Sequence, residues 1–169
     1  MKRYLLTLLL SLLFASSAAA ALKPNDTAPI FSLRDLDGKV FFLSNYAGAM
    51  KNVKGNGVIL GFFASWCTGC RNELPLINSL VDELSGNGIK VVIVDVKEDV
   101  DTIRALLAEL KVDKAVVLMD RSGEAGDKYQ VRFLPTTFFI GADGRVKDII
   151  FGEIKDQREL KASAGKLLK

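Results

Sequence analysis

The feature that most constrains the fold of this chain is the alternation of apolar runs and amphipathic segments through its middle. A continuous apolar run at 58–63, a run rich in β-branched residues at 89–94 and a short run at 115–119 predict strands, because a strand buried on both faces carries apolar residues at nearly every position. Between these runs, apolar residues recur at spacings of three and four over 68–84 and 100–110, which predicts two helices. Strands alternating with helices predict a parallel sheet with helices on both faces.

Asp-Gly dipeptides between apolar runs predict a hairpin near each end of this α/β core. They occur at Asp37-Gly38 and at Asp143-Gly144. The remaining predicted elements are strands within 31–43 and at 136–140 and 146–151, a short helix at 122–130 and a final helix at 155–168. We therefore predict one α/β domain with a central mixed sheet and an extra N-terminal β-hairpin. Pro75 should kink the helix that contains it.

The N-terminus has the pattern of a secretory signal peptide. Lys2 and Arg3 precede an uncharged, mostly apolar run that ends in four alanines. We predict a signal peptide over 1–21 and one domain over 22–169. An uncleaved membrane anchor is the alternative, since the uncharged stretch approaches the ~20 residues that a span needs. In both cases the domain is exported, to the periplasm if the signal is cleaved, where disulfides persist.

The chain has two cysteines, Cys67 and Cys70, and no histidine, which excludes several kinds of site. A Ser-His-Asp triad, a Cys-His pair and an imidazole metal site cannot form. A zinc half-site would need two further ligands, which neither Cys nor His can supply. We expect no metal and no cofactor beyond the two thiols. The formal net charge of +3 falls to about +1 without the two basic residues of the signal, so nucleic acid is not an expected partner.

Cys67 and Cys70 lie where a predicted buried strand gives way to a helix. Unpaired N–H groups and the helix dipole stabilise a thiolate there, so the pKa of Cys67 should fall below about 8.5. At this spacing Cys70 can reach the sulfur of Cys67, and the pair can cycle between dithiol and disulfide. Two other interpretations are a structural disulfide, which would stabilise little across so short a loop, and a pair of inert buried thiols.

Three segments resemble the TlpA/ResA-like thiol–disulfide oxidoreductases, a branch of the thioredoxin-fold family. They read APIFSLRDLDGKVFFLSNYAG, VILGFFASWCTGCRNELPLINSL and VRFLPTTFFIGADGRV, and the resemblance extends over 26–168. It implies a thioredoxin-like fold in which Cys67 attacks a substrate disulfide and Cys70 resolves the mixed disulfide. It also implies substrate contacts at the residues Trp66, Leu134 and Pro135, with Pro135 as a cis-proline that faces the disulfide. The alternative for Trp66 is simple core packing.

The sequence departs from the family pattern near the motif. Many thioredoxins carry a buried acid six residues before the attacking cysteine, where this chain has Gly61. That absence leaves the proton of the resolving thiol to water or another group. Glu98 matches an acidic position common in this branch and could tune the site, although a loop-end carboxylate is usually only solvated. Thr68, in the spacer, could cap the helix.

We expect an exported enzyme that reduces disulfides of protein substrates, for example of apocytochrome c, and that a membrane thiol donor recharges. The resemblance implies this task, and a monomer. A thiol peroxidase related to peroxiredoxins, which share the N-terminal hairpin, is one alternative. A non-catalytic peptide-binding module is another. A Cys-x-x-Cys pair can reduce or oxidise, so the residues alone leave the direction open.

Overall fold

The computed structural model of the protein describes residues 21–48 and 53–169, so residues 1–20 of the predicted signal peptide lie outside the described part and the domain boundary stays a prediction. The strands are β1 (Ser32–Asp35), β2 (Val40–Phe42), β3 (Gly57–Phe63), β4 (Ile89–Val96), β5 (Val116–Asp120), β6 (Thr136–Gly141) and β7 (Val146–Phe151). The helices are α1 (Thr68–Ser79), α2 (Val81–Gly86), α3 (Val100–Leu110), α4 (Glu124–Lys128) and α5 (Gln157–Ala164), with the short 3-10 helices η1 (Leu43–Asn45) and η2 (Gly165–Leu168).

The seven strands form one mixed sheet in the order β2-β1-β5-β4-β3-β6-β7. The three strands of the alternating region, β3, β4 and β5, run parallel. The two hairpins close the sheet, with β1 antiparallel to β5 on one side and β6 antiparallel to β3 on the other. The predicted mixed sheet with an extra N-terminal hairpin is confirmed, and β3 lies inside it with a partner on each side.

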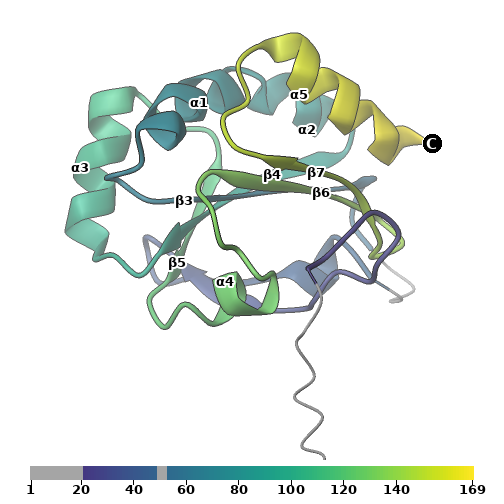
Figure 1. Ribbon diagram of the computed structural model, residues 1–169, viewed down its shortest axis with the longest axis horizontal. Helices are drawn as coiled ribbons and strands as arrows, with labels where there is room; N and C mark the ends of the chain where they lie inside the picture. The colour runs from purple at the N-terminus through teal and green to yellow at the C-terminus, as the bar shows by residue number, and fades with distance from the viewer. Residues whose placement is uncertain (1–20, 49–52) are drawn as a thin grey trace, which may run out of the picture.

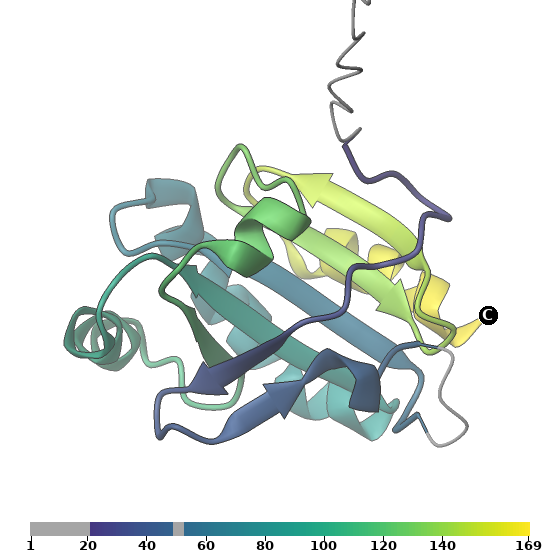
Figure 2. The ribbon, with the colours of Figure 1, turned by 90° about the horizontal axis from the view of Figure 1, so that it is seen from below.

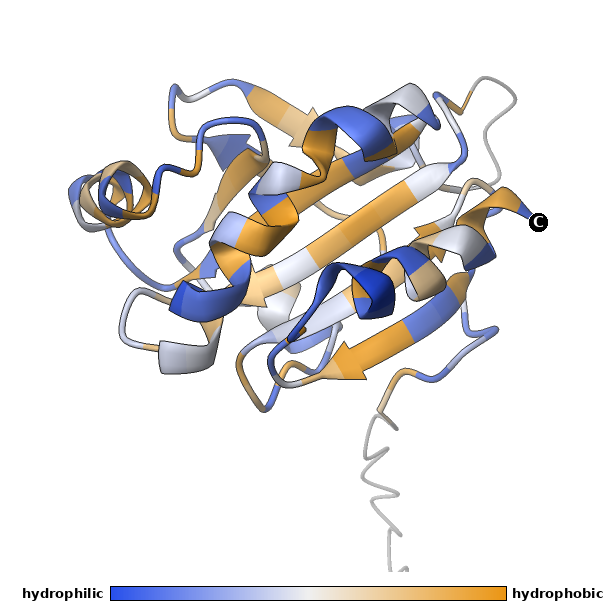
Figure 3. Ribbon diagram, turned by 90° about the horizontal axis from the view of Figure 1, so that it is seen from above, coloured by the Kyte–Doolittle hydropathy of each residue, from blue (hydrophilic) through white to orange (hydrophobic). Residues whose placement is uncertain are grey.

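Helices cover both faces of the sheet, but unequally. Helices α1, α2, α3 and α5 lie on one face, and α4 lies on the other, as Figure 1 shows. In Figure 2, seen from below, α4 and the N-terminal segment cross that second face. In Figure 3, seen from above, apolar stretches of the central strands lie beneath the four helices. Helix α1, which contains Cys70 and has Cys67 at its N-cap, thus lies on the face that four helices cover.

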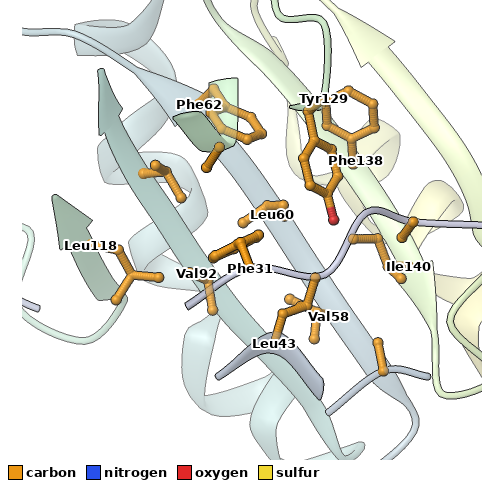
Figure 4. Close-up of a cluster of buried hydrophobic side chains, with 14 of the residues drawn as sticks. Phe31, Leu43, Val58, Leu60, Phe62, Val92, Leu118, Tyr129, Phe138 and Ile140 are labelled. Carbon is orange, nitrogen blue, oxygen red and sulfur yellow. The ribbon is translucent and has the colours of Figure 1, made fainter. Parts of the chain in front are cut away.

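An aromatic cluster fixes the N-terminal segment to the α4 face (Figure 4). The Tyr129 ring lies 4.9 Å from that of Phe138 and 5.4 Å from that of Phe62, centroid to centroid. The Tyr129 hydroxyl donates a hydrogen bond of 3.0 Å to the carbonyl oxygen of Pro29. The segment before β1, which has few apolar residues of its own, is thus held against the core by this side chain and by Phe31.

The predicted helix over 68–84 is two helices. Helix α1 continues through Pro75, and the interruption comes at Leu80, where the backbone N–H bonds to the carbonyl of Ile77 in a 3-10 pattern. Apolar residues on both sides of the break belong to one buried cluster, so the spacing in the sequence continues across it. No helix in the described part of the chain is long and apolar enough to cross a membrane.

Candidate active site

Cys67 and Cys70 form a disulfide at the end of β3 and the start of α1, with their Cα atoms 5.2 Å apart. Both belong to the buried cluster that α1, α3 and the central strands share. Cys67 is 7% exposed and Cys70 is 0% exposed. Cys67 is therefore the more exposed of the two residues, in agreement with the order of exposure that the family resemblance implies.

The sulfur of Cys67 itself caps α1. Cys67 has extended backbone angles at the N-cap position, and its Sγ accepts a hydrogen bond of 3.1 Å from the backbone N–H of Cys70. The prediction that Thr68 caps the helix is wrong, because Thr68 is already the first helical residue and the cap position precedes it. The helix N–H that a threonine would have taken is therefore available to a thiolate on Cys67.

Cis-proline geometry is present at the Leu134–Pro135 peptide bond, as the resemblance implies. A Cβ placed on Gly69, inside the Cys-x-x-Cys turn, would lie 3.3 Å from Cδ of Pro135. The proline ring therefore lies directly against the turn. Leu134 is half-buried and packs against the apolar clusters on both faces of the sheet. Its backbone role in substrate pairing stays a prediction.

Three exposed aromatic side chains lie on segments next to this turn and proline. Trp66, next to Cys67, is 73% exposed, so the alternative that it simply packs in the core is wrong. Phe133, two residues before Pro135, and Phe151, at the end of β7, are also largely exposed. The backbone joins the last two segments, because Gly152 N–H donates to the Pro135 carbonyl at 2.8 Å. Large exposed apolar side chains on neighbouring segments favour a surface that binds another molecule.

Glu98 is not a solvated loop end. Its Oε2 accepts a hydrogen bond of 2.7 Å from the backbone N–H of Ser65, and its Oε1 accepts one of 2.5 Å from the Ser65 hydroxyl. Ser65 begins the turn that leads to Cys67. Glu98 is thus joined to the active-site turn through Ser65, and its role in tuning the site stays a prediction.

Residues 24–149 match the sequence model of the AhpC/TSA family. The chain is 35% identical over 133 residues to the thiol-disulfide oxidoreductase ResA of Bacillus thuringiensis subsp. konkukian, across 78% of this chain and 72% of that relative. It is 33% identical over 129 residues to ResA of Bacillus subtilis, across 76% and 68%. The chain belongs to the AhpC/TSA family. Within that family it is a ResA-like thiol–disulfide oxidoreductase of thioredoxin-like fold.

A solved structure supports the same family assignment. The crystal structure from Chlorobium tepidum described as a thiol:disulfide interchange protein of DsbE type has a TM-score of 0.72 and 29% identity, and covers 86% of this chain and all of that one. The names of these relatives support the leading prediction over a thiol peroxidase and over a non-catalytic peptide-binding module.

The first functional candidate that sequence reasoning missed in this ResA-like site is Glu73. It lies on α1 one turn after Cys70 and is 2% exposed. Its Oε2 accepts a hydrogen bond of 2.9 Å from the backbone N–H of Ile154, in the segment that follows β7. Burial raises the pKa of Glu73 from 4.5 to about 7, despite that hydrogen bond, so this acid can hold or release a proton near neutral pH. The signal in the sequence was an acid on the apolar face of a predicted helix.

The second candidate is Asp95, which bears on the buried acid that is absent at Gly61. Gly61 lies in β3 on the face toward α1, and a Cβ there would meet Ile93 of β4 at 3.6 Å. Two residues beyond Ile93, and so on the same face, stands Asp95, which is 0% exposed. A buried acid is therefore present on the α1 face of the sheet, on the strand next to Gly61 and two residues farther along in register. Within the described residues, no three His, Cys, Asp or Glu side chains are placed to hold a metal ion.

Proposed function

We propose that this protein reduces disulfides by attack of the Cys67 thiolate. The thiolate displaces one sulfur of a substrate disulfide as a thiolate and forms a mixed disulfide. Cys70, once deprotonated, attacks the Cys67 sulfur, forms the Cys67–Cys70 disulfide and releases the second substrate thiolate. Two electrons pass to the substrate, and two protons end on its thiols. The accessible Cys67 and the enclosed Cys70 support this order of steps.

The proposed direction, reduction of the substrate disulfide, rests on the acidic residues around the Cys-x-x-Cys motif. Carboxyl groups of Glu73, Glu98 and Glu153 lie around the motif, the last with Oε2 within 3.4 Å of where a Cβ on Gly69 would stand. Arg71, the residue after Cys70, is paired with Glu109 of α3. Negative charge disfavours a thiolate, and a less stable dithiol is a stronger reductant. The start of α1 acts the other way, since its N–H groups and dipole stabilise the thiolate.

We expect the carboxyl groups to dominate, because there is no imidazolium in the chain to stabilise the thiolate further. Equilibrating the Cys67–Cys70 couple with mixtures of reduced and oxidised glutathione should give a potential near that of thioredoxin, about −270 mV. A value near −120 mV, typical of strong oxidants, would overturn the proposed direction.

The exposed aromatic side chains Trp66, Phe133 and Phe151 favour a polypeptide substrate with apolar residues beside its cysteines. We propose that the protein is exported to the periplasm by its N-terminal segment, acts there as a monomer, and receives electrons from a membrane thiol donor. Apocytochrome c, whose haem-binding Cys-x-x-Cys-His segment must be reduced before haem attachment, is the proposed substrate.

A peptide comparison tests the substrate. The reduced protein should reduce an oxidised Cys-x-x-Cys-His peptide with apolar flanks faster than the same peptide with those flanks replaced by serine. Trp66→Ala should remove most of this preference while leaving the rate with a small aromatic disulfide unchanged. Equal rates for the two peptides would contradict recognition by the aromatic surface.

A further inference from the structure

Asp95 is a buried acid in a strand whose other residues, apart from Lys90, are apolar. It lies near the end of β4, in register with Phe63 of β3 and Met119 of β5, and both neighbours belong to the cluster that contains the disulfide. Burying a carboxyl group costs free energy unless it is hydrogen-bonded. The hydrogen-bond partner of the Asp95 carboxyl group therefore indicates its role.

The side-chain hydrogen bond of Asp95 is with Glu98. Oδ2 of Asp95 accepts a hydrogen bond of 3.1 Å from the backbone N–H of Glu98. The other oxygen, Oδ1, is buried and has no hydrogen-bond partner among the described residues. Burial and the nearby Glu98 and Asp120 carboxyl groups raise the pKa of Asp95 to about 7. Well below neutral pH the buried side chain is therefore mostly uncharged.

Glu98 carries the contact onward to the active-site turn. One carboxylate oxygen of Glu98 accepts from the Ser65 N–H and the other accepts from the Ser65 hydroxyl, so both oxygens bind the same residue. The backbone N–H of Cys67 in turn bonds to the carbonyl of Ala64 at 3.2 Å. A continuous hydrogen-bonded chain therefore runs from the buried acid in β4 through Glu98 to the turn that presents Cys67.

We propose that Asp95 is a positioning residue for thiol–disulfide exchange: it holds the backbone of Glu98 so that the Glu98 carboxylate stays on Ser65, and with it the turn that presents Cys67. Asp95 acts through the backbone N–H of Glu98, which it anchors from inside the sheet. Without that hydrogen bond, the loop that carries Glu98 is free to move away from Ser65. A misplaced turn would weaken the Cys70 N–H contact with the Cys67 sulfur and lower the fraction of time in which Cys67 can attack.

The test uses the fully reduced protein at pH 6 and a neutral small disulfide, 4,4′-dithiodipyridine, followed by stopped-flow absorbance. At this pH Asp95 is mostly protonated, so Asp95→Ala removes the hydrogen bond to the Glu98 N–H and little charge. Its rate should fall by roughly tenfold, and the pKa of Cys67, from thiolate absorbance, should rise. Asp95→Asn keeps an oxygen that can accept from the Glu98 N–H and should retain most of the rate. Because the probe is a small molecule, the result does not depend on the proposed physiological direction or protein substrate.

Two comparisons separate positioning from general stability. Asp99→Ala removes the N-cap of α3 in the same loop, where Asp99 Oδ1 accepts from Thr102 N–H at 2.9 Å, and should leave rate and Cys67 pKa unchanged. Glu98→Ala removes a nearby charge as well as the contact with Ser65, so its rate is compared per Cys67 thiolate, using the measured pKa of Cys67. Expressed in this way, its rate should fall as that of Asp95→Ala does, and the double variant should show no further loss, since both act through one chain. A folded Asp95→Ala protein with wild-type rate and Cys67 pKa would overturn the proposal. So would additive losses in the double variant, or an Asp95→Asn protein as slow as Asp95→Ala.

Discussion

Replacing Cys67 by serine is expected to abolish disulfide reduction, whereas replacing Cys70 by serine should leave the first step intact and block the second. The nucleophile is a thiolate, and a serine hydroxyl at the same N-cap position does not ionise near neutral pH. Cys70 is fully buried and so takes no part in the encounter with substrate. The measurement is incubation of each variant with an oxidised protein substrate, followed by non-reducing electrophoresis.

The two variants control each other. Cys70→Ser should accumulate a mixed disulfide through Cys67 that dithiothreitol releases, and Cys67→Ser should form none. Adding Cys67→Ser to the Cys70→Ser protein should remove the trapped band. A band of equal intensity in Cys67→Ser would show that Cys70 attacks first and would contradict the assignment based on exposure.

The strand-and-helix order followed from the sequence because it is local. Strands buried on both faces are apolar throughout, and Asp-Gly turns fix hairpins, so the runs around 58–63 and 89–94 gave β3 and β4 within one or two residues. The break at Leu80 could not be predicted from the sequence. The apolar residues on both sides of the break pack into one cluster, so their helical spacing continues across it.

The two cysteines and the cis-proline could be predicted because they belong to recognisable sequence motifs. The buried acids belong to no such motif and could not be predicted. Glu73 and Asp95 are acids in apolar surroundings, and their burial depends on which loops and strands cover them. Ile154, which bonds to Glu73, is 81 residues away along the chain. Glu98 was identified, but its link to Ser65, 33 residues away, is a tertiary contact of the same kind.

The oxidised protein is expected to lose stability as the pH rises from about 4.5 to about 7, and Glu73→Gln should remove a large part of that loss. The pKa of Glu73 is raised from 4.5 to about 7 by burial. In this window the folded chain keeps the proton that the unfolded chain releases, so the unfolded state binds fewer protons and stability falls with rising pH. The loss from this group is on the order of 3 kcal/mol and is constant above pH 7.

Urea unfolding of the oxidised protein at pH 4.5 and at pH 7.5 measures this difference without titration of the thiols. Glu73→Gln keeps an oxygen to accept from Ile154 N–H and has no charge to bury, so its two curves should lie closer together. Glu124→Gln is the matched control, because Lys128 holds the pKa of this exposed acid below its usual value and outside the window. The pKa of Asp95 is also raised to about 7, so Asp95 adds to the loss of stability with rising pH. This part of the pH dependence should remain in Glu73→Gln and should disappear in the double variant Glu73→Gln/Asp95→Asn. A Glu73→Gln protein with the wild-type slope would mean that Glu73 is ionised in the folded state at pH 5, and the proton it is proposed to hold would then be absent.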